Sequence, residues 1–308
     1  MLRRLALLLF VQLCALPALA EAPKVVTDIP ATESLVAQIM GETGSPSVLM
    51  GAGTDPHHYQ LKPSQARALQ DADLLIWIGP EMSPWLQRVA ARMPKGHSMP
   101  LLAVQDTRRL PLAAGDDHGG DDHGGDSDGH EHVSDIDPHA WLDPENGKIW
   151  ARAIADALAA RDPGNAATYR ANLDKVIASI AQAEAEAEVV QLLAPERNKN
   201  FIVFHDAYRY FITYFNIGPV EALTLSDGSP PSAARLSQLK TRIARAGAVC
   251  AFPEAQHDTR LLQAAIEGTG ARLGEPLDPS GTTLKAGPDL YQRLILALAQ
   301  SIANCLAG

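Results

Sequence analysis

The sequence predicts an α/β protein with two βα lobes, mostly parallel sheets, one long rigid helix that joins the lobes and a cleft between them. Two series of short apolar, β-rich runs alternate with helical stretches, the first over residues 24–101 and the second over residues 201–306. Between the series, residues 165–193 contain neither Gly nor Pro. Strands that alternate with helices are typical of a parallel sheet covered on both faces.

The first lobe is expected to span residues 21–163. Its predicted strands are residues 25–27, 47–50, 73–78 and 98–101, and the run DLLIWI before Gly79 and Pro80 is the most apolar of them. Helices are predicted over residues 34–40, 64–70 and 84–93. A further helix begins at Pro144, a residue favoured in a first helical turn, and ends at Asp162-Pro163-Gly164.

The joining helix is expected within residues 164–193. At 1.5 Å per residue, a helix over residues 165–193 would be about 43 Å long, the length of a whole domain. A helix of that length predicts a rigid spacer between two lobes, and a coiled-coil pairing helix is the alternative.

The second lobe is expected to span residues 194–308. Strands are predicted over residues 201–204, 220–222, 248–252 and 272–274, and helices over residues 208–215, 231–246, 259–268 and 288–306. Ligands of open α/β sheets bind beyond the carboxyl ends of the strands, so residues that directly follow the strands are candidates for a site.

Residues 1–20 read as a secretory signal peptide. Arg3 and Arg4 precede an apolar stretch, and Ala18-Leu19-Ala20 is a small-residue cleavage site. We expect a mature chain from Glu21 that is exported to the periplasm and not inserted in the membrane. Two cysteines then remain in a compartment that permits disulfides, Cys250 and Cys305, and they are expected to pair, with two buried free thiols as the alternative.

Residues 116–137, named here the His/Asp segment, contain nine acidic side chains, four histidines and no Lys or Arg. The glycine-rich composition predicts a disordered loop over residues 115–137. Without this segment and the signal peptide, the chain has 24 basic and 27 acidic residues, which gives no basic surface for nucleic acid or anionic lipid. The segment favours accessory metal binding over a merely solvated linker, through His118, His123, His130 and His132.

Three other histidines each follow a strand or lie in a loop beside Pro or an aromatic residue: His57 in GTDPHHY, His139 in DPHAWLDP and His205 in FHDAY. One such histidine alone is more often structural. Three imidazoles from separate segments provide the nitrogen ligands of a tetrahedral Zn²⁺ site with a fourth position for water or a carboxylate. Asp278 in PLDPSG is the candidate protein ligand for that position.

Neighbouring residues leave alternatives open. His58 competes with His57 for the ligand role. Asp206 and Glu254 also follow strands and could orient an imidazole by accepting its N–H, although N-capping of a helix explains Asp206 equally well.

These motifs, together with LLIWIGPEM, CAFPE and LDPSGTTLKAG, closely resemble those of the ZnuA family, the zinc-binding periplasmic receptors of bacterial ABC importers in the cluster of metal-binding solute receptors. The resemblance covers essentially the whole mature chain. It implies Zn²⁺ held between the lobes by His57, His139 and His205, and a Cys250–Cys305 bridge. Some relatives have Glu directly before the first histidine, where this chain has Pro56.

The resemblance implies a receptor, not an enzyme, that captures Zn²⁺ and delivers it to an inner-membrane ABC permease with its ATPase, and we expect a monomer. A receptor for Mn²⁺ is less favoured, because Mn²⁺ prefers carboxylate oxygen to imidazole. A zinc hydrolase lacks a signature such as H-E-x-x-H for a general base. A surface metal-dependent adhesin lacks a cysteine for a lipid anchor.

Overall fold

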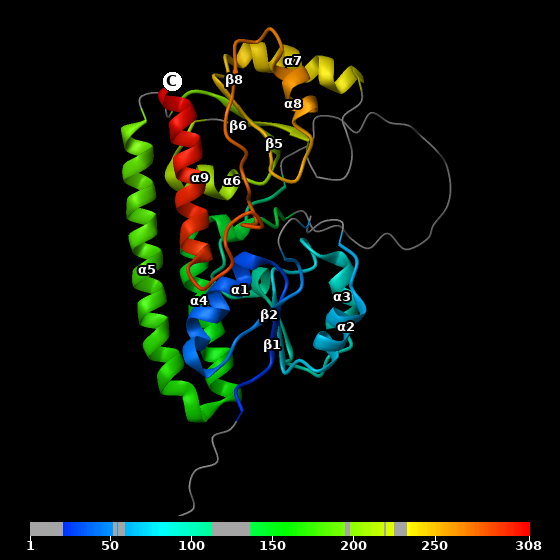
Figure 1. Ribbon diagram of the computed structural model, residues 1–308, viewed down its shortest axis with the longest axis vertical. Helices are drawn as coiled ribbons and strands as arrows, with labels where there is room; N and C mark the ends of the chain where they lie inside the picture. The colour runs from blue at the N-terminus through cyan, green and yellow to red at the C-terminus, as the bar shows by residue number, and fades with distance from the viewer. Residues whose placement is uncertain are drawn as a thin grey trace, which may run out of the picture.

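The computed structural model describes residues 21–51, 54, 59–112, 136–194, 198–218, 220–224 and 233–308. Its strands form two four-stranded parallel sheets, one in each lobe (Figure 1). The first has the order β2-β1-β3-β4 and the second β6-β5-β7-β8, so the two sheets have the same strand order. The predicted α/β class with two parallel-sheet lobes is confirmed.

Strands of the first sheet are β1 (Val25–Thr27), β2 (Ser47–Val48), β3 (Leu74–Trp77) and β4 (Ser98–Pro100). The second sheet contains β5 (Phe201–His205), β6 (Val220–Thr224), β7 (Cys250–Phe252) and β8 (Arg272–Leu273). Central strands β3 and β5 are buried at every residue, as expected for parallel strands covered on both faces.

Helices of the first lobe each begin at a proline: α1 (Pro30–Met40), α2 (Pro63–Gln70) and α3 (Pro84–Ala90). Proline suits the first helical turn, where its missing N–H costs no internal hydrogen bond. The predicted start of the first helix at residue 34 was therefore wrong by four residues. Helix α3 ends at Ala90 rather than at residue 93.

Three long helices pack together in the region of the connection: α4 (Pro144–Arg161) of the first lobe, and α5 (Ala166–Leu193) and α9 (Leu290–Ala307), which run between the lobes. Helix α5 has 28 residues and packs along both α4 and α9 (Figure 1). Helix α9 follows the second sheet in sequence but packs against α1 of the first lobe as well. Two helices thus run between the lobes side by side, where the sequence predicted one.

Buried polar contacts fix α9 to the first lobe. The Ser34 hydroxyl donates to the Pro288 carbonyl at 2.6 Å and accepts from the Tyr291 amide at 3.0 Å, and the Gln292 amide donates to Gln38 at 2.8 Å. Gly147 of α4 leaves room for the Tyr291 side chain, since a Cβ there would lie 2.3 Å from the Tyr291 hydroxyl oxygen.

The second sheet is covered by α6 (Arg209–Phe215) on the side of the connecting helices and by α7 (Ala233–Ala246) and α8 (Thr259–Ile266) on the other. Alternation along β5 produces this division. Phe201 and Val203 belong to the large core shared with the first lobe, whereas Ile202 and Phe204 belong to a separate core beneath α7 and α8.

A disulfide joins Cys250 at the start of β7 to Cys305 in the last turn of α9, with 6.1 Å between the Cα atoms. The predicted pairing is confirmed. The bond ties the end of α9 to a central strand of the second sheet.

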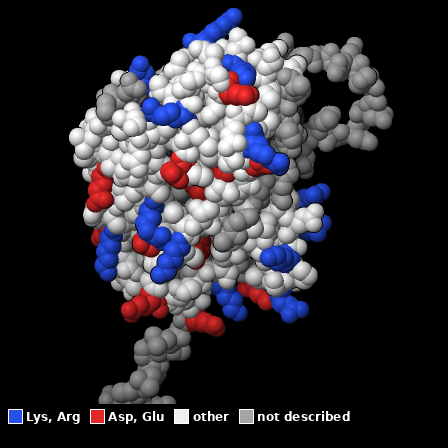
Figure 2. All heavy atoms as spheres, turned by 45° about the horizontal axis from the view of Figure 1, so that its top comes forward, with Lys and Arg blue, Asp and Glu red and all other residues white. Residues whose placement is uncertain are grey.

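Within the described part of the chain, no helix is long and apolar enough to cross a bilayer. On the face shown in Figure 2, acidic and basic side chains are interspersed over both lobes.

Candidate metal site

Two of the predicted ligand residues, His139 and His205, meet between the lobes. His205 is the last residue of β5, where the carboxyl end of the strand opens toward the first lobe, and it is 2% exposed. His139 directly precedes the short 3₁₀ helix Ala140–Leu142 of the first lobe and is 5% exposed. The structure thus brings together a histidine at the end of a strand and one in a loop beside Pro138.

The Nε2 atoms of His139 and His205 lie 3.3 Å apart. The other nitrogen of each ring is held by a carboxylate: His139 Nδ1 lies 2.8 Å from Asp137 Oδ1, and His205 Nδ1 lies 2.6 Å from Glu254 Oε1. A carboxylate at Nδ1 favours the tautomer with its proton there, in which Nε2 carries the lone pair that can bind a metal.

The separation of these two nitrogens suits a tetrahedral metal ion. Two ligands at about 2.05 Å from Zn²⁺, at the tetrahedral angle, are separated by about 3.3 Å. Both nitrogens therefore already lie at the spacing that one zinc ion requires.

Glu254 is itself held in place. The Tyr208 hydroxyl donates to the same Oε1 at 3.0 Å, and the other carboxylate oxygen lies 3.7 Å from His257 Nε2. The His257 ring stacks on Phe204, with 4.3 Å between the ring centroids. Glu254 thus acts as the acceptor that orients His205, the role expected from its position after a strand.

His139 is braced by residues of both lobes. Its ring lies against Trp141, with 5.2 Å between centroids. The Trp141 indole donates to the Pro279 carbonyl at 2.7 Å, and the Tyr291 hydroxyl donates to the Trp141 carbonyl at 2.8 Å. The loop that precedes α9 and the first turn of α9 therefore position the segment that carries His139.

Asp206 lies beside the pair without capping a helix, because α6 begins after Tyr208. Burial raises the pKa of its carboxyl above the usual range. The Arg209 guanidinium opposes this shift, and the Asp137 carboxylate adds to it. The carboxyl contributes further negative potential next to the two imidazoles.

Asp278, the candidate fourth ligand, is buried in the loop after Leu277. One of its oxygens accepts from the Thr283 amide and hydroxyl, both at 2.6 Å, and the other accepts from the Ser280 amide at 3.2 Å. These bonds organise the loop, and Asp278 would have to exchange some of them to bind a metal.

The remaining predicted residues are outside the described part of the chain: His57 and its competitor His58, and the segment histidines His118, His123, His130 and His132. In the described part, no three His, Cys, Asp or Glu side chains form a complete metal site. The pair His139 and His205 is the portion of the predicted site that the structure describes.

Sequence reasoning missed two residues of this site, Asp137 and Tyr208. Asp137 had a readable signal, since the motif Asp137-Pro138-His139 places a short carboxylate two residues before a candidate ligand, where it accepts from both the His139 amide, at 3.0 Å, and the ring. Nothing in the sequence indicated that the Tyr208 hydroxyl would bond to Glu254 Oε1, the same oxygen that contacts the His205 ring.

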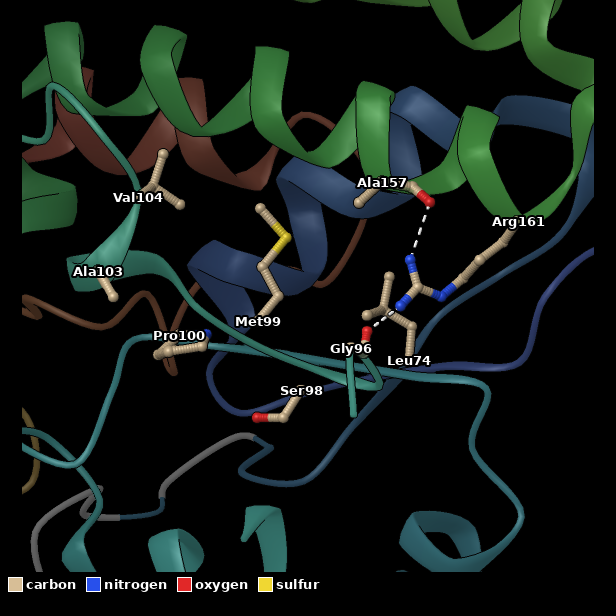
Figure 3. Close-up of a pocket in the computed structure, with 9 residues that line it drawn as sticks. All are labelled: Leu74, Gly96, Ser98, Met99, Pro100, Ala103, Val104, Ala157 and Arg161. Carbon is tan, nitrogen blue, oxygen red and sulfur yellow. Dashed lines mark hydrogen bonds between the residues drawn. The ribbon is translucent and has the colours of Figure 1, made fainter. Parts of the chain in front are cut away.

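A separate pocket of about 320 Å³ lies beside edge strand β4, between Met99, Pro100 and the end of α4 (Figure 3). The Arg161 guanidinium there donates to the carbonyls of Gly96 and Ala157. No predicted ligand residue lines this pocket, so it is distinct from the histidine pair.

The comparison with protein families matches residues 25–305 to "ZnuA: Zinc-uptake complex component A periplasmic". The chain belongs to the ZnuA family. A ZnuA protein of Paracoccus denitrificans, named a high-affinity zinc uptake system protein, is 47% identical over 96% of this chain and 95% of that protein.

Solved ZnuA structures share the fold. One described as a crystal structure of ZnuA is 29% identical, with a TM-score of 0.73 over 92% of this chain and 99% of that one. Another, a ZnuA deletion mutant with zinc bound, is 28% identical, with a TM-score of 0.73 over 93% of this chain and 99% of that one.

Membership of the ZnuA family confirms the resemblance seen in the sequence motifs. The protein is a periplasmic zinc-binding receptor and not an enzyme, which decides against the hydrolase reading. Zinc is its cargo, as the nitrogen-rich pair also indicates.

Proposed function

We propose that the protein captures periplasmic Zn²⁺ between its lobes, at a site made by His57, His139 and His205, and delivers it to an inner-membrane ABC permease with its ATPase. The observation that carries this proposal is the 3.3 Å separation of the His139 and His205 Nε2 atoms, each imidazole held by its own carboxylate. A preformed pair of imidazoles lowers the ordering cost of binding an ion.

His57 is proposed as the third nitrogen ligand. The fourth position is left to water or Asp278. Water is the better supported of the two, because both oxygens of Asp278 already accept hydrogen bonds within their own loop. A site of three imidazoles and water selects Zn²⁺ over Mn²⁺, which prefers carboxylate oxygen.

The His/Asp segment is proposed as an accessory that gathers zinc at weak sites. Its two flanks lie together, since Pro111 and Ile136 form an antiparallel bridge and the Asp137 amide donates to the Leu110 carbonyl at 2.9 Å. The segment is therefore attached two residues from His139. Residues 1–20 are proposed as the signal peptide that brings the chain to the periplasm, where it acts as a monomer.

Zinc titration of residues 21–308 tests this proposal, with a competing chelator to measure tight binding. His139→Ala, His205→Ala and His57→Ala should each weaken zinc binding by more than the 10- to 100-fold that is typical of losing an outer partner. His97, partly exposed and in the first lobe, provides the matched control, and His97→Ala should leave the affinity unchanged. Tight binding that survives loss of His139 or His205 would place the main site elsewhere.

A further inference from the structure

The hydroxyl of Tyr210 joins the two lobes at the flanks of the His/Asp segment. Tyr210 belongs to α6 of the second lobe, yet its hydroxyl accepts from the Leu110 amide at 2.8 Å and donates to the Asp137 carbonyl at 3.0 Å. The side chain is 1% exposed. A buried hydroxyl with both an acceptor and a donor partner holds both backbone groups in place.

These contacts close a ring of hydrogen bonds around the backbone of Asp137. The Asp137 amide donates to the Leu110 carbonyl, while the Leu110 amide donates to Tyr210 and Tyr210 donates to the Asp137 carbonyl. Burial raises the pKa of Tyr210 to about 12, so the hydroxyl keeps its proton at neutral pH and continues to donate.

The position of Asp137 decides the position of His139. Oδ1 of Asp137 accepts from both the backbone amide and the ring Nδ1 of His139, at 3.0 and 2.8 Å. Oδ2 is buried and has no hydrogen-bond partner among the described residues. The carboxylate thus has a single anchored oxygen, and a displacement of its backbone is passed directly to the imidazole.

We propose that Tyr210 is a positioning residue for zinc binding, which acts through Asp137 to set the distance between the Nε2 atoms of His139 and His205. This inference rests on the proposed ligand roles of both histidines. Tyr210 does not touch the metal. Helix α6 begins four residues after His205, so the same short element locates His205 through the chain and His139 through the Tyr210 hydroxyl.

Tyr210→Phe tests the proposal, with Tyr214→Phe as the matched control. Tyr214 lies one turn later on α6, and its hydroxyl donates to Glu184, away from Asp137. Zn²⁺ alone is the probe for affinity, and the visible spectrum of bound Co²⁺ reports the ligand geometry. We expect Tyr210→Phe to weaken zinc binding by about 10-fold or more and to change the Co²⁺ spectrum, as for other outer partners of metal ligands, and Tyr214→Phe to do neither.

A purely structural role gives a different result. Both variants would then unfold at lower denaturant concentration while zinc affinity and the Co²⁺ spectrum stayed as in the parent, and this outcome would overturn the proposal. A double-mutant cycle with Asp137→Ala adds a second condition. If Tyr210 acts through Asp137, the double variant binds zinc no more weakly than Asp137→Ala alone, and additive losses would contradict that route.

A measurement on the unaltered protein covers the case in which Tyr210→Phe does not fold. Zinc should slow hydrogen exchange at the Leu110 amide, because a bound ion fixes His139, Asp137 and the hydroxyl that accepts from this amide. Unchanged exchange there would refute the inference. Failure of the proposed function is distinguishable, since His139→Ala would then retain tight binding, whereas failure of this inference alone leaves His139→Ala impaired and Tyr210→Phe normal.

Discussion

The Nδ1 atom of His205 lies 2.6 Å from Oε1 of Glu254, and both side chains are almost completely buried. A buried carboxylate at this distance orients the ring and makes its other nitrogen a stronger ligand. The Glu254 side chain is buried too deeply for water to take over the role of its carboxylate if the charge is removed by substitution.

Glu254→Gln should therefore weaken zinc binding by about 10- to 100-fold while the fold is kept, because an outer carboxylate is lost with little change in shape. Competition with a chromophoric chelator at constant pH measures the effect. Glu275 is exposed, and Glu275→Gln is the control that removes the same charge from the surface. Equal affinities for the two variants would mean that Glu254 is not a tuning partner of the site.

Deletion of residues 116–132 should remove the weak additional zinc equivalents and slow capture at low zinc, leaving one tight site. The chain ends left by the deletion can be joined, because the flanking residues Pro111 and Ile136 already pair with each other. Titration calorimetry counts the equivalents, and stopped-flow capture at limiting zinc measures the rate. Loss of tight binding with the deletion would reverse the roles assigned to the segment and to the histidine pair.

Replacement of both Cys250 and Cys305 by Ser should destabilise the protein by about 4 kcal/mol in the chain-entropy model. The bridge spans a sequence separation of 55 residues. Urea unfolding of the zinc-free protein, compared with the oxidised parent, measures the difference. Because the bridge touches neither imidazole, zinc affinity of the folded variant should equal that of the parent, and a large loss of affinity would show that the tie at the last turn of α9 also positions the site.

Asp28 should make stability fall as the pH rises. Its carboxylate is fully buried between the Ile29 and Ile78 amides, which donate to it at 2.8 and 2.7 Å, and burial raises its pKa from 3.8 to about 6. A raised folded pKa stabilises the fold fully below the unfolded value, and this contribution is lost as pH rises through about 6. The difference between the two pKa values corresponds to about 3 kcal/mol.

Asn cannot ionise, so the Asp28→Asn variant is the reference for this effect. Urea unfolding at pH 4 and pH 7 gives the free energy of unfolding of parent and variant at each pH, and the difference between the two proteins is then compared between the two pH values. From pH 4 to pH 7, the free energy of unfolding of the parent should fall relative to that of the variant by up to about 3 kcal/mol. A constant difference would show that the carboxyl is equally protonated in the folded and unfolded chain.

Strand positions were predictable because apolar β-rich runs such as FIVF are short and bounded by turn residues. The starts of helices were harder to predict. Helix α1 begins at Pro30, because proline breaks the interior of a helix but suits its first turn. The meeting of His139 and His205 was indicated by their motifs, since His205 follows FIVF and His139 lies in a loop beside Pro138. Tyr208 was not predictable, because its hydroxyl reaches Glu254 in a side-chain direction that periodicity cannot specify, whereas the motif Asp137-Pro138-His139 carried a signal for Asp137.

The packing of α9 against α1 bears on how the protein is assembled. Ser34 bonds to Tyr291 at a sequence separation of 257, so the first lobe is not complete until α9 has packed against it. Contacts of such long range fold slowly, because a large loop must close before they form. Until α9 has packed, one side of α1 is uncovered and the segment that carries His139 lacks its brace from Tyr291. We therefore expect zinc capture at the histidine pair only after α9 has packed against α1.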